Sequence, residues 1–259
     1  MSRASRERVY RTEAIILRRR NWGEADRILT LFSPLRGKFR AKAVGVRKPR
    51  SRKAGHLEPF TRTMLLLARG RELDIITQAE TVEAYRALRE DLVRLASATY
   101  AAELLDRFSP EEVENLKAYE LLGSTLGALC RASAVEPILR SYDLHLLEAL
   151  GYRPQLGSCT VGQEDILPQD QFFSPSRGGV VCPTCASLAP DSQPLSLGAL
   201  RVMRHLQREN LGAVENLKVS PKVAAEVELI LQGYILHLLE RPLKSPPFLH
   251  EVAGAGPLR

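Results

Sequence analysis

Residues 33–55 read SPLRGKFRAKAVGVRKPRSRKAG, and this basic stretch decides the fold. In its first half Lys38, Arg40 and Lys42 alternate with one phenylalanine and two alanines. Because successive side chains of a β-strand point to opposite faces, the pattern predicts a strand with one cationic and one buried face. The buried face requires a core beneath it, and the cationic face is typical of a site for an anionic partner.

The second half of the stretch carries a denser run of charge, made of Arg47, Lys48, Arg50, Arg52 and Lys53. A proline among these residues and the loss of alternation predict a mobile cationic loop rather than a helix or strand. A merely solvated run of charge is the alternative. The loop follows a patterned strand directly, which favours a binding surface.

Length and charge limit the fold and the partner. The 259 residues, 44% hydrophobic and 26% charged, suffice for two domains and a small third module. Residues 1–71 hold 20 Lys and Arg against 5 Asp and Glu, a balance of +15, whereas residues 72–259 hold 17 against 25, a balance of −8. We therefore expect any polyanion site in the N-terminal third.

The sequence indicates a soluble protein with no membrane partner. No apolar run reaches the ~18 residues of a membrane-spanning helix, and residues 12–17 are too short and too polar for the core of a signal peptide. We expect a cytoplasmic, nucleoid-associated protein. In that reducing compartment the four cysteines suggest metal binding or free thiols.

Five β-rich segments precede the helical part of the chain. They span residues 10–18, 25–33, 38–46, 60–68 and 72–82, with turn signals between them. Five short strands predict a small barrel of the Greek-key OB fold, which binds oligonucleotides. We assign residues 1–80 to this domain, with a disordered basic leader at the start.

From residue 81 apolar side chains recur at helical spacing, so residues 81–259 are predicted to form an α-helical domain. A second helix is expected to begin at Ser109 and Pro110 and to run to Arg131. Further helices are predicted at 135–150, 196–208 and 220–239, followed by a frayed tail at 244–259. Residues 152–190 are an insertion, and the fold class is α+β.

The insertion contains Cys159, Cys182 and Cys185. Two cysteines separated by two residues form half of a zinc-ribbon knuckle, and a structural zinc site takes four ligands. The position of the missing fourth cysteine is occupied by Gly162. Glu164, the following aspartate or water could replace it, so both a structural zinc ion and a vestigial module with free thiols stay open.

Trp22 is the only tryptophan and follows Arg18, Arg19 and Arg20 in the first predicted turn. Single-stranded nucleic acids are bound by cations along the backbone and by aromatic faces that stack on bases, each worth ~1–3 kcal/mol. This arrangement indicates a stacking site beside phosphate contacts. A place for Trp22 in the core is the alternative.

Common enzyme motifs are absent. The sequence contains no G-x-x-x-x-G-K-[ST] loop and no G-x-G-x-x-G after a strand. His56 and Glu58 together with the cysteine pair superficially resemble a zinc deaminase, but Val181 stands where that signature has proline, and the halves lie over a hundred residues apart. We therefore expect a binding protein rather than an enzyme.

Residues 10–80, YRTEAIILRRRNWGEADRILTLFSPLRGKFRAKAVGVRKPRSRKAGHLEPFTRTMLLLARGRELDIITQAE, are similar to the opening of the bacterial RecO family of DNA repair proteins. The later string LHLLEALGYRP and the GG turn before VCPTC follow in the family's order. The resemblance implies an OB barrel and a helical domain with an inserted zinc module. Gly162 departs from the family's four-cysteine pattern.

The resemblance also implies a recombination mediator that binds single- and double-stranded DNA and anneals complementary strands without ATP. It implies RecR and the acidic C-terminal tail of single-stranded-DNA-binding protein (SSB) as partners, with RecA loaded as the outcome. Arg131, Arg140, Arg201 and Arg204 are candidate anchors for that tail. The alternative is an OB-fold module that binds RNA in an assembly and does not anneal strands.

Overall fold

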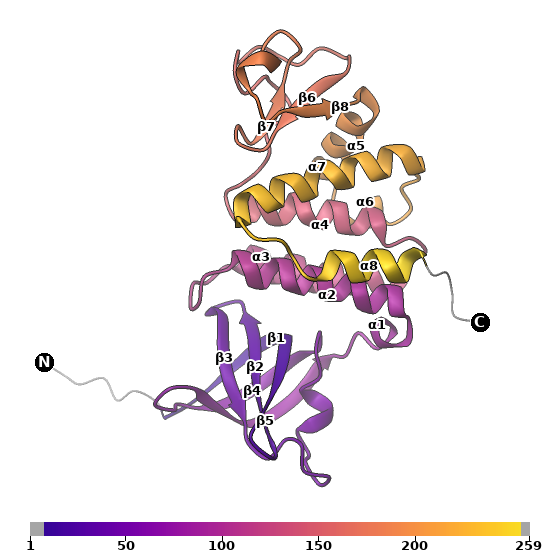
Figure 1. Cartoon of the computed structure of the whole chain (residues 1–259). Helices are drawn as coiled ribbons and strands as arrows, with labels where there is room; N and C mark the ends of the chain where they lie inside the picture. The colour runs from indigo at the N-terminus through magenta and orange to yellow at the C-terminus, as the bar shows by residue number, and fades with distance from the viewer. Residues whose placement is uncertain (1–7, 255–259) are drawn as a thin grey trace, which may run out of the picture.

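The computed structural model describes residues 8–254 and has the predicted α+β composition. A five-stranded barrel lies at one end, the helices form the middle, and a small three-stranded sheet lies at the other end (Figure 1). The barrel strands are β1 (Val9–Trp22), β2 (Asp26–Ser33), β3 (Gly37–Ala43), β4 (Arg62–Ala68) and β5 (Asp74–Glu83).

The barrel closes in the order β1-β2-β3-β5-β4, as expected for an OB-like domain. Neighbouring strands are antiparallel except β3 and β5, which run parallel over two residue pairs. The alternation read from the sequence of β3 is confirmed, because Phe39, Ala41 and Ala43 are buried inside the barrel.

The barrel and the helical domain share apolar surface along β1. Ala14 and Ile16 point into the barrel core, whereas Ile15 and Leu17 pack with the helices, together with Phe32 of β2. This division follows the two-residue period of a strand. Both faces of β1 are buried here, which explains why residues 14–17 are all apolar. The helices therefore cover part of the outer barrel surface.

Eight helices occur in residues 8–254, and the longer ones agree with the sequence in most bounds. The segment predicted to end at Arg131 does so, and the helix opened by Pro221 continues to Leu239. They are α1 (Ala87–Glu90), α2 (Leu92–Phe108), α3 (Leu116–Arg131), α4 (Glu136–Ala149), α5 (Leu197–Arg208), α6 (Leu211–Val214), α7 (Pro221–Leu239) and α8 (Ser245–Gly254). No helix in this described part is long and apolar enough to cross a bilayer.

Two predicted helix starts are wrong. Residue 81 lies in β5, and the first helix begins only at Ala87. Ser109 ends α2, and Asn115 caps α3 by accepting a hydrogen bond from the Ala118 N–H. The chain between Ser109 and Asn115 is not helical, because a contact with a distant strand replaces the helical hydrogen bond: the Glu112 N–H donates to the Lys38 carbonyl oxygen of β3 at 2.7 Å.

The C-terminal tail was also predicted wrongly, because α8 occupies most of it. Glu103 of α2 accepts hydrogen bonds from the backbone N–H groups of Lys244 and Ser245. N–H groups at the start of a helix have no partner within it, so Glu103 supplies the acceptor that α8 lacks there. The last residues of the predicted frayed tail, 255–259, and residues 1–7 of the predicted basic leader lie outside the described residues.

The insertion between α4 and α5 forms the small sheet at the far end of the molecule (Figure 1). Its strands are β6 (Gln171–Ser174), β7 (Gly179–Val181) and β8 (Gln193–Leu195), in the order β7-β6-β8. Short 3-10 turns occur at Ala54–His56 in the barrel and at Ala186–Leu188 in the insertion.

Candidate nucleic-acid interface and cysteine cluster

The end of β1 carries four of the predicted site residues, Arg18, Arg19, Arg20 and Trp22, and all four are exposed. The Arg20 guanidinium carbon lies 5.5 Å from the centre of the Trp22 ring, a cation–π distance. Arg19 forms an ion pair with Glu58. Since Trp22 is 45% exposed, it is a surface residue, and the alternative of a core tryptophan is excluded.

Lys38 is the most constrained of the three strand cations. Its Nζ donates to the Asp106 carbonyl oxygen at 2.5 Å and lies 3.3 Å from the Asp106 carboxylate. Only 14% of its side chain is exposed. Lys38 therefore links β3 to the end of α2, and this contact occupies its ammonium group.

Arg40 and Lys42 point outward from β3 and are more accessible. Arg40 lies 3.3 Å from Glu111 and is 53% exposed, while Lys42 lies 3.0 Å from Asp26. Ion pairs this exposed contribute little to stability, so an anionic ligand can compete with the carboxylates for the cations.

The strand register joins these cations to those of β1. Two rows of paired residues cross β1, β2 and β3, namely Arg18 with Thr30 and Arg40, and Arg20 with Ile28 and Lys42. Paired residues share one side of a sheet, so the cations of each row point the same way. We call Arg18, Arg20, Trp22, Arg40 and Lys42 the outer cationic face.

The basic loop after β3 lies beside this face. Its exposed cations are Arg47, Lys48, Arg50 and Arg52. The Arg47 N–H donates to the Ala25 carbonyl oxygen at 2.9 Å, which places the loop against the turn between β1 and β2. The loop therefore extends the cationic surface past Trp22, and its mobility stays a prediction.

Lys53 differs from the other predicted loop contacts. It is half-buried, and its Nζ donates to the Ile76 carbonyl oxygen of β5 at 2.8 Å. Burial lowers the pKa of this ammonium group. Lys53 thus fastens the loop to the barrel.

Arg36 is an important residue that the sequence did not single out. Its guanidinium contacts Asp74 at 2.7 Å, the Tyr10 hydroxyl at 2.5 Å and the Glu112 carboxylate. These partners come from β5, β1 and the segment between α2 and α3, at sequence separations of 26 to 76 residues. Because its partners are so far away in the sequence, no local pattern could have shown that Arg36 links these three segments.

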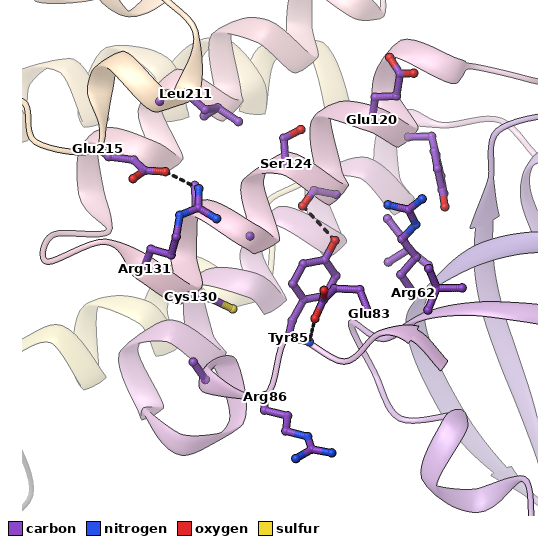
Figure 2. Close-up of a pocket in the computed structure, with 18 of the residues that line it drawn as sticks. Arg62, Glu83, Tyr85, Arg86, Glu120, Ser124, Cys130, Arg131, Leu211 and Glu215 are labelled. Atoms are coloured by element: carbon purple, nitrogen blue, oxygen red, sulfur yellow. Dashed lines mark hydrogen bonds and ion pairs between the residues drawn. The ribbon is translucent and has the colours of Figure 1, made fainter. Parts of the chain in front are cut away.

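A cleft of about 950 Å³ is lined by residues of the barrel, α3 and the α6 region (Figure 2). Tyr85 lies at its centre and donates a hydrogen bond to the Gly123 carbonyl oxygen at 3.2 Å. Arg131 pairs with Glu215 across it at 2.6 Å, and Arg62 pairs with Glu13 at 2.6 Å. The charged residues that line the cleft are three arginines and three glutamates, so the cleft has no excess of positive charge and suits phosphate less than the outer cationic face with its basic loop.

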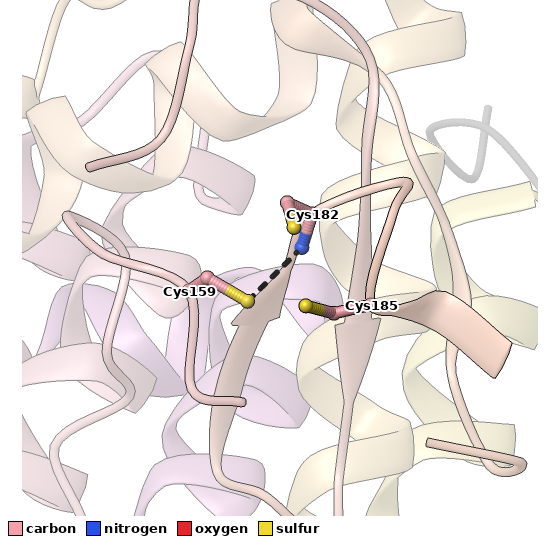
Figure 3. Close-up of side chains that lie close together, drawn as sticks. All are labelled: Cys159, Cys182 and Cys185. Atoms are coloured by element: carbon pink, nitrogen blue, oxygen red, sulfur yellow. Dashed lines mark hydrogen bonds between the residues drawn. The ribbon is translucent and has the colours of Figure 1, made fainter. Parts of the chain in front are cut away.

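The three cysteines of the insertion meet, as the sequence predicted (Figure 3). The sulfur atoms of Cys159, Cys182 and Cys185 all lie within 4.8 Å of one another. Backbone N–H groups of Cys182 and Gly162 point at the Cys159 sulfur from 3.4 and 3.3 Å. Burial would raise the pKa of Cys159, but these N–H groups lower it to about 7, which favours the thiolate that binds metals.

The cluster suits a zinc ion in its donor chemistry. Sulfur atoms bound to one tetrahedral zinc lie 2.3 Å from the metal, and three converging thiols are the soft ligands that zinc prefers. Around them Val181 and Ala189 form a very small apolar core. The cluster can therefore hold a metal ion and is compatible with zinc.

Two family models cover nearly the whole described chain. The model of the recombination protein O N-terminal domain matches residues 7–85, and the model of its C-terminal domain matches residues 89–247. The boundary between the matches falls where β5 gives way to α1.

Full-length relatives agree with these matches. The DNA repair protein RecO of Roseiflexus sp. (strain RS-1) is 48% identical over 95% of this chain and 87% of its own length. The proteins of that name from Pelotomaculum thermopropionicum and Dehalococcoides mccartyi (strain ATCC BAA-2266) are 40% and 35% identical, over 96% and 95% of this chain and 96% and 97% of their own lengths. This chain therefore belongs to the RecO family.

Proposed function

We propose that this chain is a DNA-binding mediator of recombinational repair, which binds single- and double-stranded DNA and anneals complementary strands without ATP. Membership of a family whose relatives are named DNA repair proteins supports the process. The outer cationic face is the single observation that supports the mechanism, because it places cations of β1 and β3 in register across β2, beside an exposed tryptophan.

The outer cationic face would contact one strand through both phosphates and bases. Arg18, Arg20, Arg40 and Lys42 neutralise backbone charge, and binding gains free energy as counterions leave the DNA. Trp22 offers a ring for base stacking, a contact that tolerates any sequence. Nothing in this arrangement reads base edges, so binding is expected to be independent of sequence.

The basic loop supplies the means to hold a second strand. Arg47, Lys48, Arg50 and Arg52 are exposed beside the face, and their charge offsets the mutual repulsion of two phosphate backbones. Complementary bases can then pair while both strands stay close. This step needs positive charge and proximity, and no nucleotide hydrolysis.

The partners proposed are RecR and the acidic tail of SSB, with RecA loading as the result. Of the four candidate anchors for the tail, Arg140 is unsuitable because only 2% of its side chain is exposed and it pairs with Asp143 at 3.1 Å. Arg204 is half-buried and donates to the Leu156 carbonyl oxygen. Arg131 and Arg201 are exposed and stay as candidates.

The test is strand annealing by the full chain without nucleotide, using complementary oligonucleotides with and without a coat of SSB. We expect annealing faster than the spontaneous rate in both cases. The binding surface is tested in parallel by competition among single-stranded DNA, duplex DNA and RNA at several salt concentrations. Preference for folded RNA together with no acceleration of annealing would contradict the proposal and favour an RNA-binding assembly module.

A further inference from the structure

Positions 159 and 162, like positions 182 and 185, are three residues apart in a tight turn, but the two turns are closed by hydrogen bonds of different span, across four residues and across three residues respectively. In one, the Cys185 N–H donates to the Cys182 carbonyl oxygen at 3.0 Å; in the other, the Gln163 N–H donates to the Cys159 carbonyl oxygen at 2.9 Å. Gly162 occupies in its turn the place that Cys185 has in the other. A fourth ligand is therefore needed on the side of Gly162.

That space is filled by a carboxylate. A Cβ atom on Gly162 would lie 3.2 Å from the Cys185 sulfur, so position 162 faces the thiols directly. The same atom would lie only 2.5 Å from Oε2 of Glu164. The Glu164 carboxylate thus occupies the volume that a side chain at position 162 would take.

The backbone holds Glu164 at this place. The Cys159 N–H donates to the Glu164 carbonyl oxygen at 2.8 Å, so the loop folds back on the first cysteine. Gln163 makes this return possible with a left-handed φ of 66°, an unusual conformation for a residue with a side chain. Within residues 8–254, no hydrogen bond or ion pair engages the Glu164 carboxylate, so it is available as a ligand.

We infer that Glu164 is the fourth ligand of the cysteine cluster, which makes this module a Cys3Glu zinc site. Glutamate oxygen binds zinc at about 2.0–2.2 Å. The Glu164 carboxylate lies outside the group of atoms within 4.8 Å of one another, so Glu164 must rotate about its side-chain bonds to bring an oxygen to an ion held by the three sulfurs. The Glu164 carboxylate thus takes the place of the cysteine thiol that is missing at position 162. Because a carboxylate is a harder ligand than a thiolate, the site is expected to hold zinc less tightly than four cysteines would.

The inference is tested on the full chain by zinc content after dialysis and by competition with a chromophoric chelator. We expect one zinc per native chain and at least about tenfold weaker affinity in Glu164→Ala, a loss already seen when groups that only support a metal ligand are removed. Asp165→Ala is the matched control, because it removes the neighbouring exposed carboxylate. It should bind zinc as the native chain does.

A double variant separates ligand loss from damage to the fold. Gly162→Cys with Glu164→Ala supplies the fourth thiol and removes the carboxylate that would collide with it, so zinc affinity should exceed that of the native chain. Cobalt substitution gives a second readout, since charge-transfer absorption should report three thiolates in the native chain and four in the double variant. Unchanged affinity and cobalt spectrum in Glu164→Ala, or a native chain that binds no zinc, would overturn the inference.

Discussion

Gly37 lies so close to Val113 that a Cβ atom on Gly37 would come within 1.8 Å of the Val113 carbonyl oxygen. The contact joins the start of β3 to the segment between α2 and α3. Beside it the Glu112 N–H donates to the Lys38 carbonyl oxygen, and Lys38 Nζ donates to the Asp106 carbonyl oxygen. These contacts join the barrel to the helical domain at the start of β3. Gly37 allows the close approach because it has no side chain.

Replacing Gly37 with alanine is expected to destabilise the protein through this contact. Gly37 also has a left-handed φ of 61°, which costs alanine ~1–2 kcal/mol by itself. Gly23→Ala is the control, because Gly23 has a similar φ of 56° and no atom within 4 Å of its Cβ position. Urea unfolding should show a larger loss for Gly37→Ala, and equal losses would mean that the interdomain contact is dispensable.

Trp22→Ala is expected to weaken single-stranded DNA binding while leaving stability nearly unchanged. Loss of one stacked base contact removes ~1–3 kcal/mol, or about 5- to 150-fold in affinity. Leu35→Ala is the matched control, since Leu35 is an exposed apolar residue of the same barrel, 80% accessible, in the β2–β3 turn. Fluorescence anisotropy with a labelled oligonucleotide measures both; equal losses in the two variants would remove Trp22 from the interface.

Arg40→Gln should reduce the salt dependence of DNA binding. Each phosphate contact contributes about −0.7 to the slope of log affinity against log salt for single strands, so loss of one contact should flatten the slope by about that amount. Arg177→Gln removes the same charge from an exposed position in the cysteine module. If both variants show the native slope, Arg40 does not touch phosphate.

The sequence was most informative where structure is set by near neighbours. The alternation in β3 correctly separated Phe39 from Lys38, because a strand fixes side-chain direction over two residues. The spacing of Cys182 and Cys185 likewise indicated a thiol cluster. These features need no knowledge of the rest of the chain.

Long-range contacts limited the prediction. The pattern around Ser109 and Pro110 is a good helix start by local rules, yet β3 binds this segment through the Glu112 N–H. For the same reason the sequence could not show that Lys38 donates a hydrogen bond to Asp106, because the two residues are 68 positions apart in the chain. Glu164 could not be preferred over its neighbours, because its position depends on the left-handed backbone of Gln163.

The last prediction concerns α8, whose start is held by the Glu103 carboxylate through the N–H groups of Lys244 and Ser245 and the Ser245 hydroxyl. Burial would raise the pKa of Glu103, but these hydrogen bonds outweigh it and the pKa is lowered. The carboxylate therefore stabilises the fold above the ordinary glutamate pKa of about 4.3, and this contribution disappears as the pH falls through the lowered folded value.

Glu103→Gln should accordingly reduce the free energy of unfolding at pH 7 by ~1.5–3 kcal/mol, the range for hydrogen bonds to a charged group. The difference from the native chain should shrink as the pH falls below the ordinary glutamate pKa of about 4.3 and through the lowered folded pKa, because Glu103 of the native chain then becomes protonated. Glu251→Gln is the control, since it removes an exposed carboxylate from α8 itself. Urea unfolding across this pH range measures the effect. A deficit in Glu103→Gln that stays constant as the pH is lowered through the acid range would show that the charge of Glu103 does not hold α8 in place.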